Sequence, residues 1–260
     1  MNPSLPHFLL MDTVSPEAVQ HYFQLLLLSV GLVALLATIW WQADTARTGE
    51  ITENRPVEAF DHLDIGGALN VLITSGEHPS LTIRGPAHAV AALRTRQYGN
   101  TLKIGQRFQF WHRTCRLFLT LTTPDLKRTE ISGANLVQFK EFHNLSALEL
   151  EITGASSVSF EGKLTTLLTE ITGASRLTLT GQGQRLNAEL TGASSLHAFD
   201  FAVEDADIEL TGACNARLHV QKHLFAEAAG ASNIQYRVLP GAGEPALRVR
   251  SAGASSVTRV

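Results

Sequence analysis

The chain is poor in cysteine and in charged residues, and it carries no excess of basic side chains. Its 260 residues include two cysteines, Cys115 and Cys214, which is too few for a disulfide-stabilised secreted fold. Charged residues make up 17% of the chain, and 21 Lys and Arg stand against 24 Asp and Glu. Binding to nucleic acid is therefore not expected, because phosphate neutralisation requires an excess of clustered Lys and Arg.

The short motifs of several common enzyme classes are also missing. The sequence contains no G-x-S-x-G, no H-E-x-x-H, no P-loop and no G-x-G-x-x-G. His219 and His223 are four residues apart, a metal-binding spacing on a helix, but in a strand context they would not converge. We therefore predict no catalytic residue, no metal site of this kind and no cofactor, and we expect the protein not to be an enzyme.

One long apolar run lies near the N-terminus. Residues Leu25 to Trp41 contain 17 consecutive residues without a charge, a length that can span a bilayer. The leader before the run holds Asp12 and Glu17 but no Lys or Arg, which disfavours a cleaved signal peptide. The sequence predicts a leader over 1–24, a single transmembrane anchor over 25–41 and a polar linker over 42–57. A buried core helix is the alternative for the apolar run.

The orientation of this anchor is only weakly encoded. Arg47 and Arg55 follow the span, and the positive-inside rule would then keep the large domain in the cytoplasm. Asp44, Glu50 and Glu53 dilute that bias. Both orientations stay open at this point.

The rest of the chain is a repeat with a period near 20 residues. A recurring E-x-x-G-A-S element occurs in variants such as EITGAS, ELTGAC and RSAGAS. Its glycines lie at spacings of 21, 19, 19, 20, 18 and 23 residues. They are Gly133, Gly154, Gly173, Gly192, Gly212, Gly230 and Gly253. A repeat of this length is typical of one coil of a solenoid.

Apolar residues alternate with polar ones on both sides of each glycine, as in a half-buried strand. Leu150 and Ile152 precede one corner, and Val158 and Phe160 follow it. Period-2 alternation excludes helices, so we predict an all-β protein, a parallel β-helix of about 20 residues per coil. The domain is expected over 58–260, with G-A-S corners from about 127 to 260. Alternation between Phe60 and Leu121 predicts further, degenerate coils, about ten in all.

Three segments and the corners after them resemble the bacterial auto-transporter adhesins with a head GIN domain. The segments are FDHLDIGGALNVLITSGEHPSLTIRG (Phe60 to Gly85), NTLKI (Asn100 to Ile104) and LTLTTPDLKRTEISGAN (Leu119 to Asn135). The resemblance implies a right-handed β-helix on the bacterial envelope without an assigned catalytic site. Together with the anchor predicted over 25–41, it favours a single-pass membrane protein whose β-helix is periplasmic or at the cell surface. The anchor itself departs from the family, in which secreted or lipoprotein leaders are common.

One column of the predicted β-helix is acidic. The residue three positions before each corner glycine is Glu130, Glu151, Glu170, Glu189, Glu209 or Glu227, and at the last corner it is Arg250. Stacked coils would place these carboxylates ~4.8 Å apart. The neighbouring columns are expected to offer little basic charge. The carboxylates are then either hydrated and tolerated, or compensated by protonation, by a weakly bound divalent cation or by a basic partner surface.

Three functional hypotheses follow. The first is a membrane-anchored, non-enzymatic β-helix that presents a repetitive surface for adhesion or envelope interactions. The second is a polysaccharide-active, lyase-like enzyme, since such enzymes use β-helices, although a shared fold alone does not establish an activity. The third is a self-assembling, membrane-bound scaffold, because the chain ends at Val260 directly after a strand-like segment and the last coil could stack on another copy.

Overall fold

A computed structural model describes residues 49–106, 117–238 and 245–260. The predicted leader and the anchor over 25–41 lie outside these residues, as does Cys115. Within the described ranges, no helix has the length and apolar character needed to cross a membrane.

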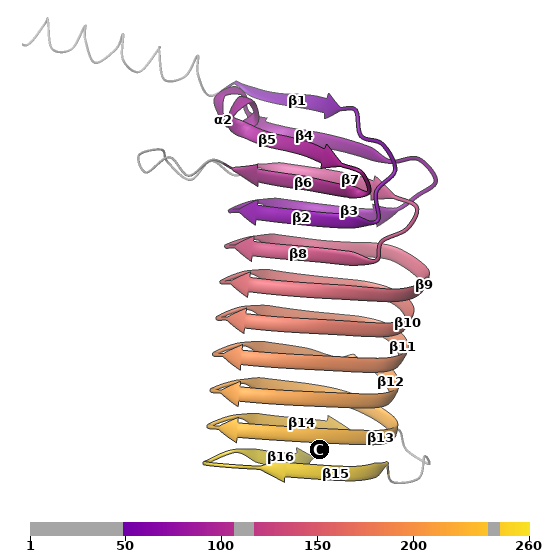
Figure 1. Cartoon of the computed structure of the whole chain (residues 1–260), viewed down its shortest axis with the longest axis vertical. Coiled ribbons are helices and arrows are strands. Elements are labelled where there is room, and N and C mark those ends of the chain that lie inside the picture. Colours follow the sequence, from indigo (N-terminus) through magenta and orange to yellow (C-terminus); the bar gives the residue numbers. More distant parts are fainter. Residues whose placement is uncertain (1–48, 107–116, 239–244) are drawn as a thin grey trace, which may run out of the picture. The chain divides into compact units, whose positions relative to one another are not determined.

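The described residues form one compact unit that is almost entirely β-structure (Figure 1). The elements in chain order are β1 (Glu50–Arg55), β2 (His62–Gly67), β3 (Asn70–Ser75), β4 (Ser80–Pro86), α2 (Ala87–Ala92), β5 (Leu93–Tyr98), β6 (Thr101–Gln106), β7 (Phe118–Thr123), β8 (Arg128–Gly133), β9 (Leu136–Gly154), β10 (Ser157–Gly173), β11 (Arg176–Gly192), β12 (Ser195–Gly212), β13 (Asn215–Gly230), β14 (Asn233–Arg237), β15 (Ala246–Ser251) and β16 (Ser256–Arg259).

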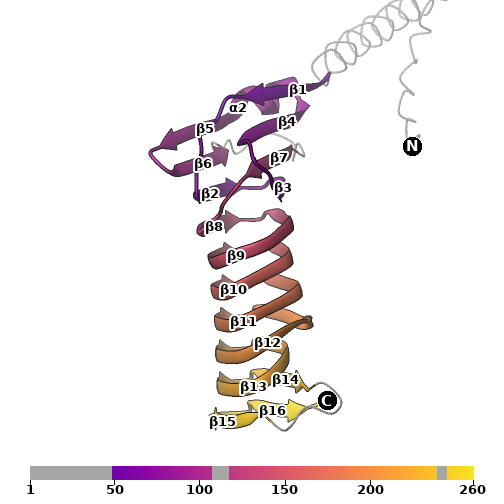
Figure 2. The same ribbon diagram turned by 90° about the vertical axis from the view of Figure 1, so that its right-hand side faces the viewer.

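The strands build a solenoid of about six turns with two sheets facing each other (Figure 2). Each long strand from β9 to β13 passes from one sheet to the other. The beginning of β9 pairs with β3 and its end pairs with β8, both in parallel. We call the sheet of β3, β14, β16 and the beginnings of the long strands the first sheet. The sheet of β2, β8, β15 and the ends of the long strands is the second sheet. The predicted parallel β-solenoid is confirmed.

The prediction of about ten coils is wrong at the N-terminal end. There, β6 and β7 still stack in parallel on β2 and β3. Beyond them, β1 pairs antiparallel with β4, β4 with β7, and β5 with β6, so β1, β4 and β5 form a cap instead of further coils. Gly99, at a φ of 55°, and Asn100 make the tight turn of the β5–β6 hairpin. Alternating apolar residues occur in parallel and antiparallel strands alike, so alternation could not distinguish a cap from a coil. Strand β1 also occupies part of the predicted linker over 42–57.

The space between the two sheets is filled by apolar side chains from every turn. Ile152, Ile171 and Leu190 stack in register at the ends of β9, β10 and β11, and each is at most 1% exposed. Phe139 and Phe160 stack at the beginnings of β9 and β10, with ring centroids 6.2 Å apart. The strong alternation in the sequence therefore corresponds to one continuous core.

The G-A-S corners hold successive turns together at one edge. In each corner the amide of the Ala donates to the carbonyl of the Gly one turn earlier, as from Ala174 N to Gly154 O at 2.8 Å. Gly173 has a φ of 101°, and a Cβ built on it would lie 2.4 Å from Gly154 O. The corner thus requires glycine for both its backbone conformation and the close approach of the previous turn.

The Ser of each corner points inward and forms a second ladder. Ser175 Oγ donates to Gly154 O at 3.2 Å and accepts from Ser156 N at 3.1 Å. Cys214 occupies the same position in its corner and is a buried free thiol, with Sγ 3.6 Å from Gly192 O. Burial raises the pKa of this thiol above its usual range. The most conspicuous motif in the sequence therefore has a structural role.

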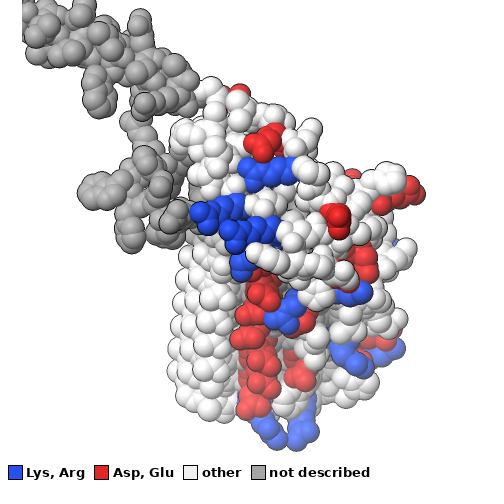
Figure 3. Space-filling model, turned by 45° about the horizontal axis from the view of Figure 1, so that its top comes forward, with Lys and Arg blue, Asp and Glu red and all other residues white. Residues whose placement is uncertain are grey.

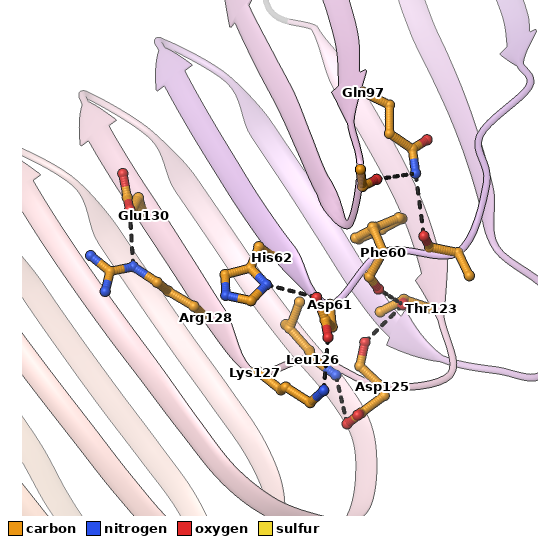
Figure 4. A network of polar contacts seen from close by, with 12 residues as sticks. Phe60, Asp61, His62, Gln97, Thr123, Asp125, Leu126, Lys127, Arg128 and Glu130 are labelled. Carbon is orange, nitrogen blue, oxygen red and sulfur yellow. Dashed lines mark hydrogen bonds and ion pairs between the residues drawn. The ribbon is translucent and has the colours of Figure 1, made fainter.

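A polar network joins the cap to the first regular turn (Figure 4). Asp61, just before β2, accepts from Lys127 Nζ at 2.8 Å and contacts His62 Nδ1 at 2.6 Å. Thr123 Oγ1 donates to Phe60 O at 3.0 Å. Hydrogen bonds from Lys127 and His62 lower the pKa of Asp61 from 3.8 to about 2. The network ties the start of β2 to the start of β8.

We predict that Gly173→Ala lowers the free energy of unfolding by about 2–4 kcal/mol, because the alanine is strained at a positive φ and its Cβ collides with the previous turn. Gly105→Ala is the matched control, since a Cβ at Gly105 meets nothing within 4 Å. Denaturant unfolding of the full chain, followed by circular dichroism, measures both. Equal losses for the two variants would contradict the corner argument.

We also predict that Asp61 stabilises the fold in a pH-dependent way. Because the pKa of Asp61 is about 2 in the folded protein and its ordinary value is 3.8, the contribution is present above pH 3.8 and disappears as the pH falls through about 2. At pH 7, Asp61→Asn should lower the free energy of unfolding by about 1 kcal/mol, a modest value because Lys127 is exposed to solvent.

The difference between wild type and Asp61→Asn should shrink towards zero near pH 2. Urea unfolding at both pH values tests this. Glu77→Gln is the control, because Glu77 is an exposed carboxylate in the β3–β4 turn and removing it leaves this network intact. A difference that stays constant down to pH 2 would refute the assignment.

Candidate functional site

The predicted acidic column exists in the structure and is one residue longer than predicted. Parallel pairing places its members directly opposite one another on consecutive strands of the second sheet. We call this row the acidic ladder; it consists of Asp64, Glu130, Glu151, Glu170, Glu189, Glu209 and Glu227. The side chains point away from the core, as the alternation requires, since the residues on either side of each glutamate face inward.

The sequence contained a signal for Asp64 that the repeat analysis missed. Asp64 lies three residues before Gly67, in D-I-G-G-A-L, which is a variant of the corner motif with Asp in place of Glu. Gly67 has a φ of 118°, like the other corner glycines. The corner series therefore begins one turn earlier than Gly133.

Both ends of the acidic ladder carry basic residues (Figure 3). At the N-terminal end, Lys103 is in register with Asp64, and its Nζ lies 2.5 Å from Asp64 Oδ2. At the C-terminal end, Arg250 is in register with Glu227, at 3.6 Å between Nη1 and Oε2. The terminal carboxylates are thus neutralised within the protein.

The expectation that neighbouring columns offer little basic charge is wrong at one position. Arg128 binds three carboxylates at once, with distances of 3.0 Å to Glu130, 2.8 Å to Glu149 and 3.0 Å to Glu151. Its guanidinium has five donors in a planar fork, so a single arginine can serve several turns. Sequence position alone could not reveal this, because the contacts join residues 21 and 23 positions apart.

The middle of the acidic ladder has no such compensation. Glu170, Glu189 and Glu209 are exposed, and none of them forms an ion pair with a described residue. Adjacent carboxylates at ~4.8 Å repel by about 1 kcal/mol per pair in water. We call these three residues the open carboxylates. They are the strongest candidate for a binding site in the part of the chain that the structure describes.

The surroundings of the open carboxylates are polar on one side and mixed on the other. A row of threonines, Thr172, Thr191 and Thr211, runs beside them in register. On the other side lie Leu168, Asn187 and Asp207. This arrangement offers a flat array of oxygen atoms, suited to contact with cations or a basic surface.

No group of three or more His, Cys, Asp or Glu among the described residues has the arrangement needed to hold a metal ion. His219 is buried in β13, whereas His223 is exposed and contacts Asp205 at 2.6 Å. The two histidines therefore do not form a site together.

Comparison with known proteins identifies the domain. A family model described as "Putative auto-transporter adhesin, head GIN domain" matches residues 59–240. No curated protein is similar enough to match the chain. The solved structures of several bacterial proteins share the fold.

Three of these structures cover four fifths of the chain. A "putative adhesin" from Bacteroides fragilis has 18% identity and a TM-score of 0.72, over 82% of this chain and 97% of its own. One from Parabacteroides merdae has 19% identity and a TM-score of 0.66, over 81% and 96%. A "putative lipid binding protein" from Parabacteroides distasonis has 15% identity and a TM-score of 0.65, over 82% and 97%. The family match, together with the repeated corners and the two-sheet solenoid, shows that this chain belongs to the head GIN domain family, which is described as "Putative auto-transporter adhesin, head GIN domain".

Proposed function

We propose that this protein is a single-pass, membrane-anchored and non-enzymatic β-solenoid that presents the acidic ladder to a ligand of the cell envelope or cell surface. The observation that carries the proposal is the row of open carboxylates, Glu170, Glu189 and Glu209. Membership of an adhesin family supports a binding role. The rigid stack supports it as well, because a preorganised row of side chains binds at a low cost in entropy.

The charge distribution favours a binding role over a stabilising one. The carboxylates at the ends of the acidic ladder form ion pairs with Lys103, Arg128 and Arg250. The open carboxylates in the middle have no basic partner among the described residues and repel one another. Like charges directly opposite each other destabilise a sheet. Residues that reduce stability without serving the fold are typical of functional surfaces.

Two kinds of ligand would relieve this repulsion. A partner with a basic surface would pair with the carboxylates and contact the threonine row. A weakly bound divalent cation would bridge adjacent carboxylates. Calorimetric titration of calcium into the full chain separates them, because heat that disappears when the open carboxylates are changed to glutamine supports the cation.

The anchor over 25–41 would hold the solenoid at the membrane. Self-association through the last turn is part of this proposal. Leu247 and Val249 are in inward-facing positions of β15 yet are 47% and 40% exposed, because no other described turn covers them. Light scattering on the full chain tests it: a second copy should cover this end, and a monomer at high concentration would argue against it.

We predict that changing all three open carboxylates to glutamine stabilises the fold but abolishes function. Removing the repulsion should raise the free energy of unfolding by about 1–2 kcal/mol at low salt and by less at about 1 M salt. In a deletion strain, cells complemented with this triple variant should attach to surfaces and to each other less than cells complemented with wild type.

The matched control changes three exposed glutamates outside the acidic ladder, Glu58, Glu77 and Glu161, to glutamine. It alters the net charge by the same amount, so it should leave attachment and stability close to wild type. The proposal would be refuted if cells carrying the triple variant of the open carboxylates attached like wild type, or if the variant protein were less stable than wild type.

The location of the solenoid gives a second prediction. Alkaline phosphatase fused to the C-terminus after Val260 should be active, because this reporter folds only outside the cytoplasm. Deleting residues 25–41 should release the fusion from the membrane fraction. An inactive but intact fusion would place the domain in the cytoplasm, in agreement with Arg47 and Arg55, and would rule out adhesion.

A further inference from the structure

The first sheet carries a polar groove on the opposite side of the solenoid from the acidic ladder. Its volume is about 320 Å³, and it spans the outer surface of β11, β12, β13 and β14. Eight residues line it: Arg176, Ser195, His197, Asn215, Ala216, Arg217, Asn233 and Gln235. The lining includes two arginines, three amides and no acidic residue.

Strand register explains how these residues come together. Arg176, Ser195, Asn215 and Asn233 form one row across consecutive turns, and His197, Arg217 and Gln235 form the next row. Within a strand the two rows are two residues apart, so both face outward. Ser195 and Asn215, which follow Arg176 in the first row, have shorter side chains than the two arginines, and the surface is hollow there.

The two arginines of the groove lack carboxylate partners. The guanidinium of Arg217 forms no hydrogen bond or ion pair with a described residue, and the one hydrogen bond of the Arg176 guanidinium among these residues runs from Nε to Ser195 Oγ at 3.4 Å. By contrast, Arg128 at the acidic ladder binds three carboxylates. The groove therefore keeps two guanidinium groups available for an external anion.

The positive charges of both guanidinium groups act on His197, which lines the groove. The pKa of His197 is lowered first by its burial, then by the positive charge of Arg217 and then by that of Arg176. His197 lies in register with Arg217 on the adjacent strand. The local potential at the centre of the groove is thus positive, while that of the second sheet is negative.

We propose that this groove binds an acidic polysaccharide, with the sugar carboxylates on Arg176 and Arg217 and the sugar hydroxyls on the amides of Asn215, Asn233 and Gln235. A guanidinium can hold a carboxylate through two parallel hydrogen bonds. An amide side chain both donates and accepts, which suits a hydroxyl group. Rows of side chains repeated at ~4.8 Å along the stack provide similar contacts for successive units of an extended chain.

The composition of the groove disfavours other anionic ligands. It has no aromatic residue on which a nucleobase could stack, and stacking contributes much of single-strand binding. It has one small apolar residue, Ala216, so it offers little contact for acyl chains of a lipid. The proposal rests on the proposed function in one respect, namely that the solenoid presents its outer surface to ligands of the cell envelope or cell surface.

The test is calorimetric binding of oligogalacturonate, a uronic-acid polymer, to the full chain. Fully methyl-esterified oligogalacturonate is the matched probe, because it keeps the sugars but loses the carboxylates. We expect binding of the acid and not of the ester. Arg217→Gln and Arg176→Gln should each weaken binding about tenfold, as expected for one charge-assisted contact.

Arg185→Gln is the control variant. Arg185 is also exposed, but it lies in the middle of β11, where that strand passes from the first sheet to the second. It is outside the groove, and the variant should bind like wild type. Unchanged thermal melting would show that the groove variants fold. Equal binding of acid and ester, or equal losses for Arg185→Gln and Arg217→Gln, would overturn the proposal. Binding to anionic phospholipid vesicles without binding to the polymer would also overturn it.

The same samples distinguish a failure of the groove proposal from a failure of the proposed non-enzymatic function. Appearance of unsaturated uronate, followed by its ultraviolet absorbance, would contradict the non-enzymatic function while leaving the groove as the polymer site. If the polymer does not bind, but the triple variant of the open carboxylates still attaches less than wild type as predicted, only the proposal about the groove is contradicted.

Discussion

The hydrogen bonds between successive G-A-S corners are the interaction on which the rest of this structure depends. At each corner an Ala amide binds the Gly carbonyl of the previous turn, and from the Gly154 corner to the Gly230 corner an inward-facing Ser or Cys binds the same carbonyl, as Ala174 and Ser175 bind Gly154. These bonds close only if every turn has the same register at this edge. Glycine permits the close approach, because any Cβ there would collide with the previous turn.

A constant register turns a sequence repeat into surface rows. Once Gly173 sits on Gly154, Glu170 must sit beside Glu151, and each outward position becomes a column. The cost of this regularity is that like residues are placed side by side, including carboxylates. The protein offsets that cost at the ends of the acidic ladder with Lys103, Arg128 and Arg250, and the open carboxylates in the middle keep their charge available. The two sheets then differ in character, with carboxylates on one and unpaired arginines on the other.

Local patterns predicted the parts of the structure that repeat. The corner spacing identified the solenoid, and counting three residues back from each glycine identified six of the seven ladder residues. Asp64 was missed because its corner, D-I-G-G-A-L, departs from the consensus, although Gly67 still adopts a positive φ. The antiparallel cap was missed because strand alternation looks the same whichever way the neighbouring strand runs.

The sequence by itself determined the period, the corners, the inward and outward faces of each strand and the acidic column, because all of these follow from residue spacing along the chain. Only the tertiary structure decided which charges are paired and which residues meet across turns. Arg128 reaches Glu151 over 23 residues, and Arg176 shares a groove with Arg217 and Asn233 because four consecutive turns stack in register. Such contacts depend on side-chain reach and strand order, which a one-dimensional spacing does not contain.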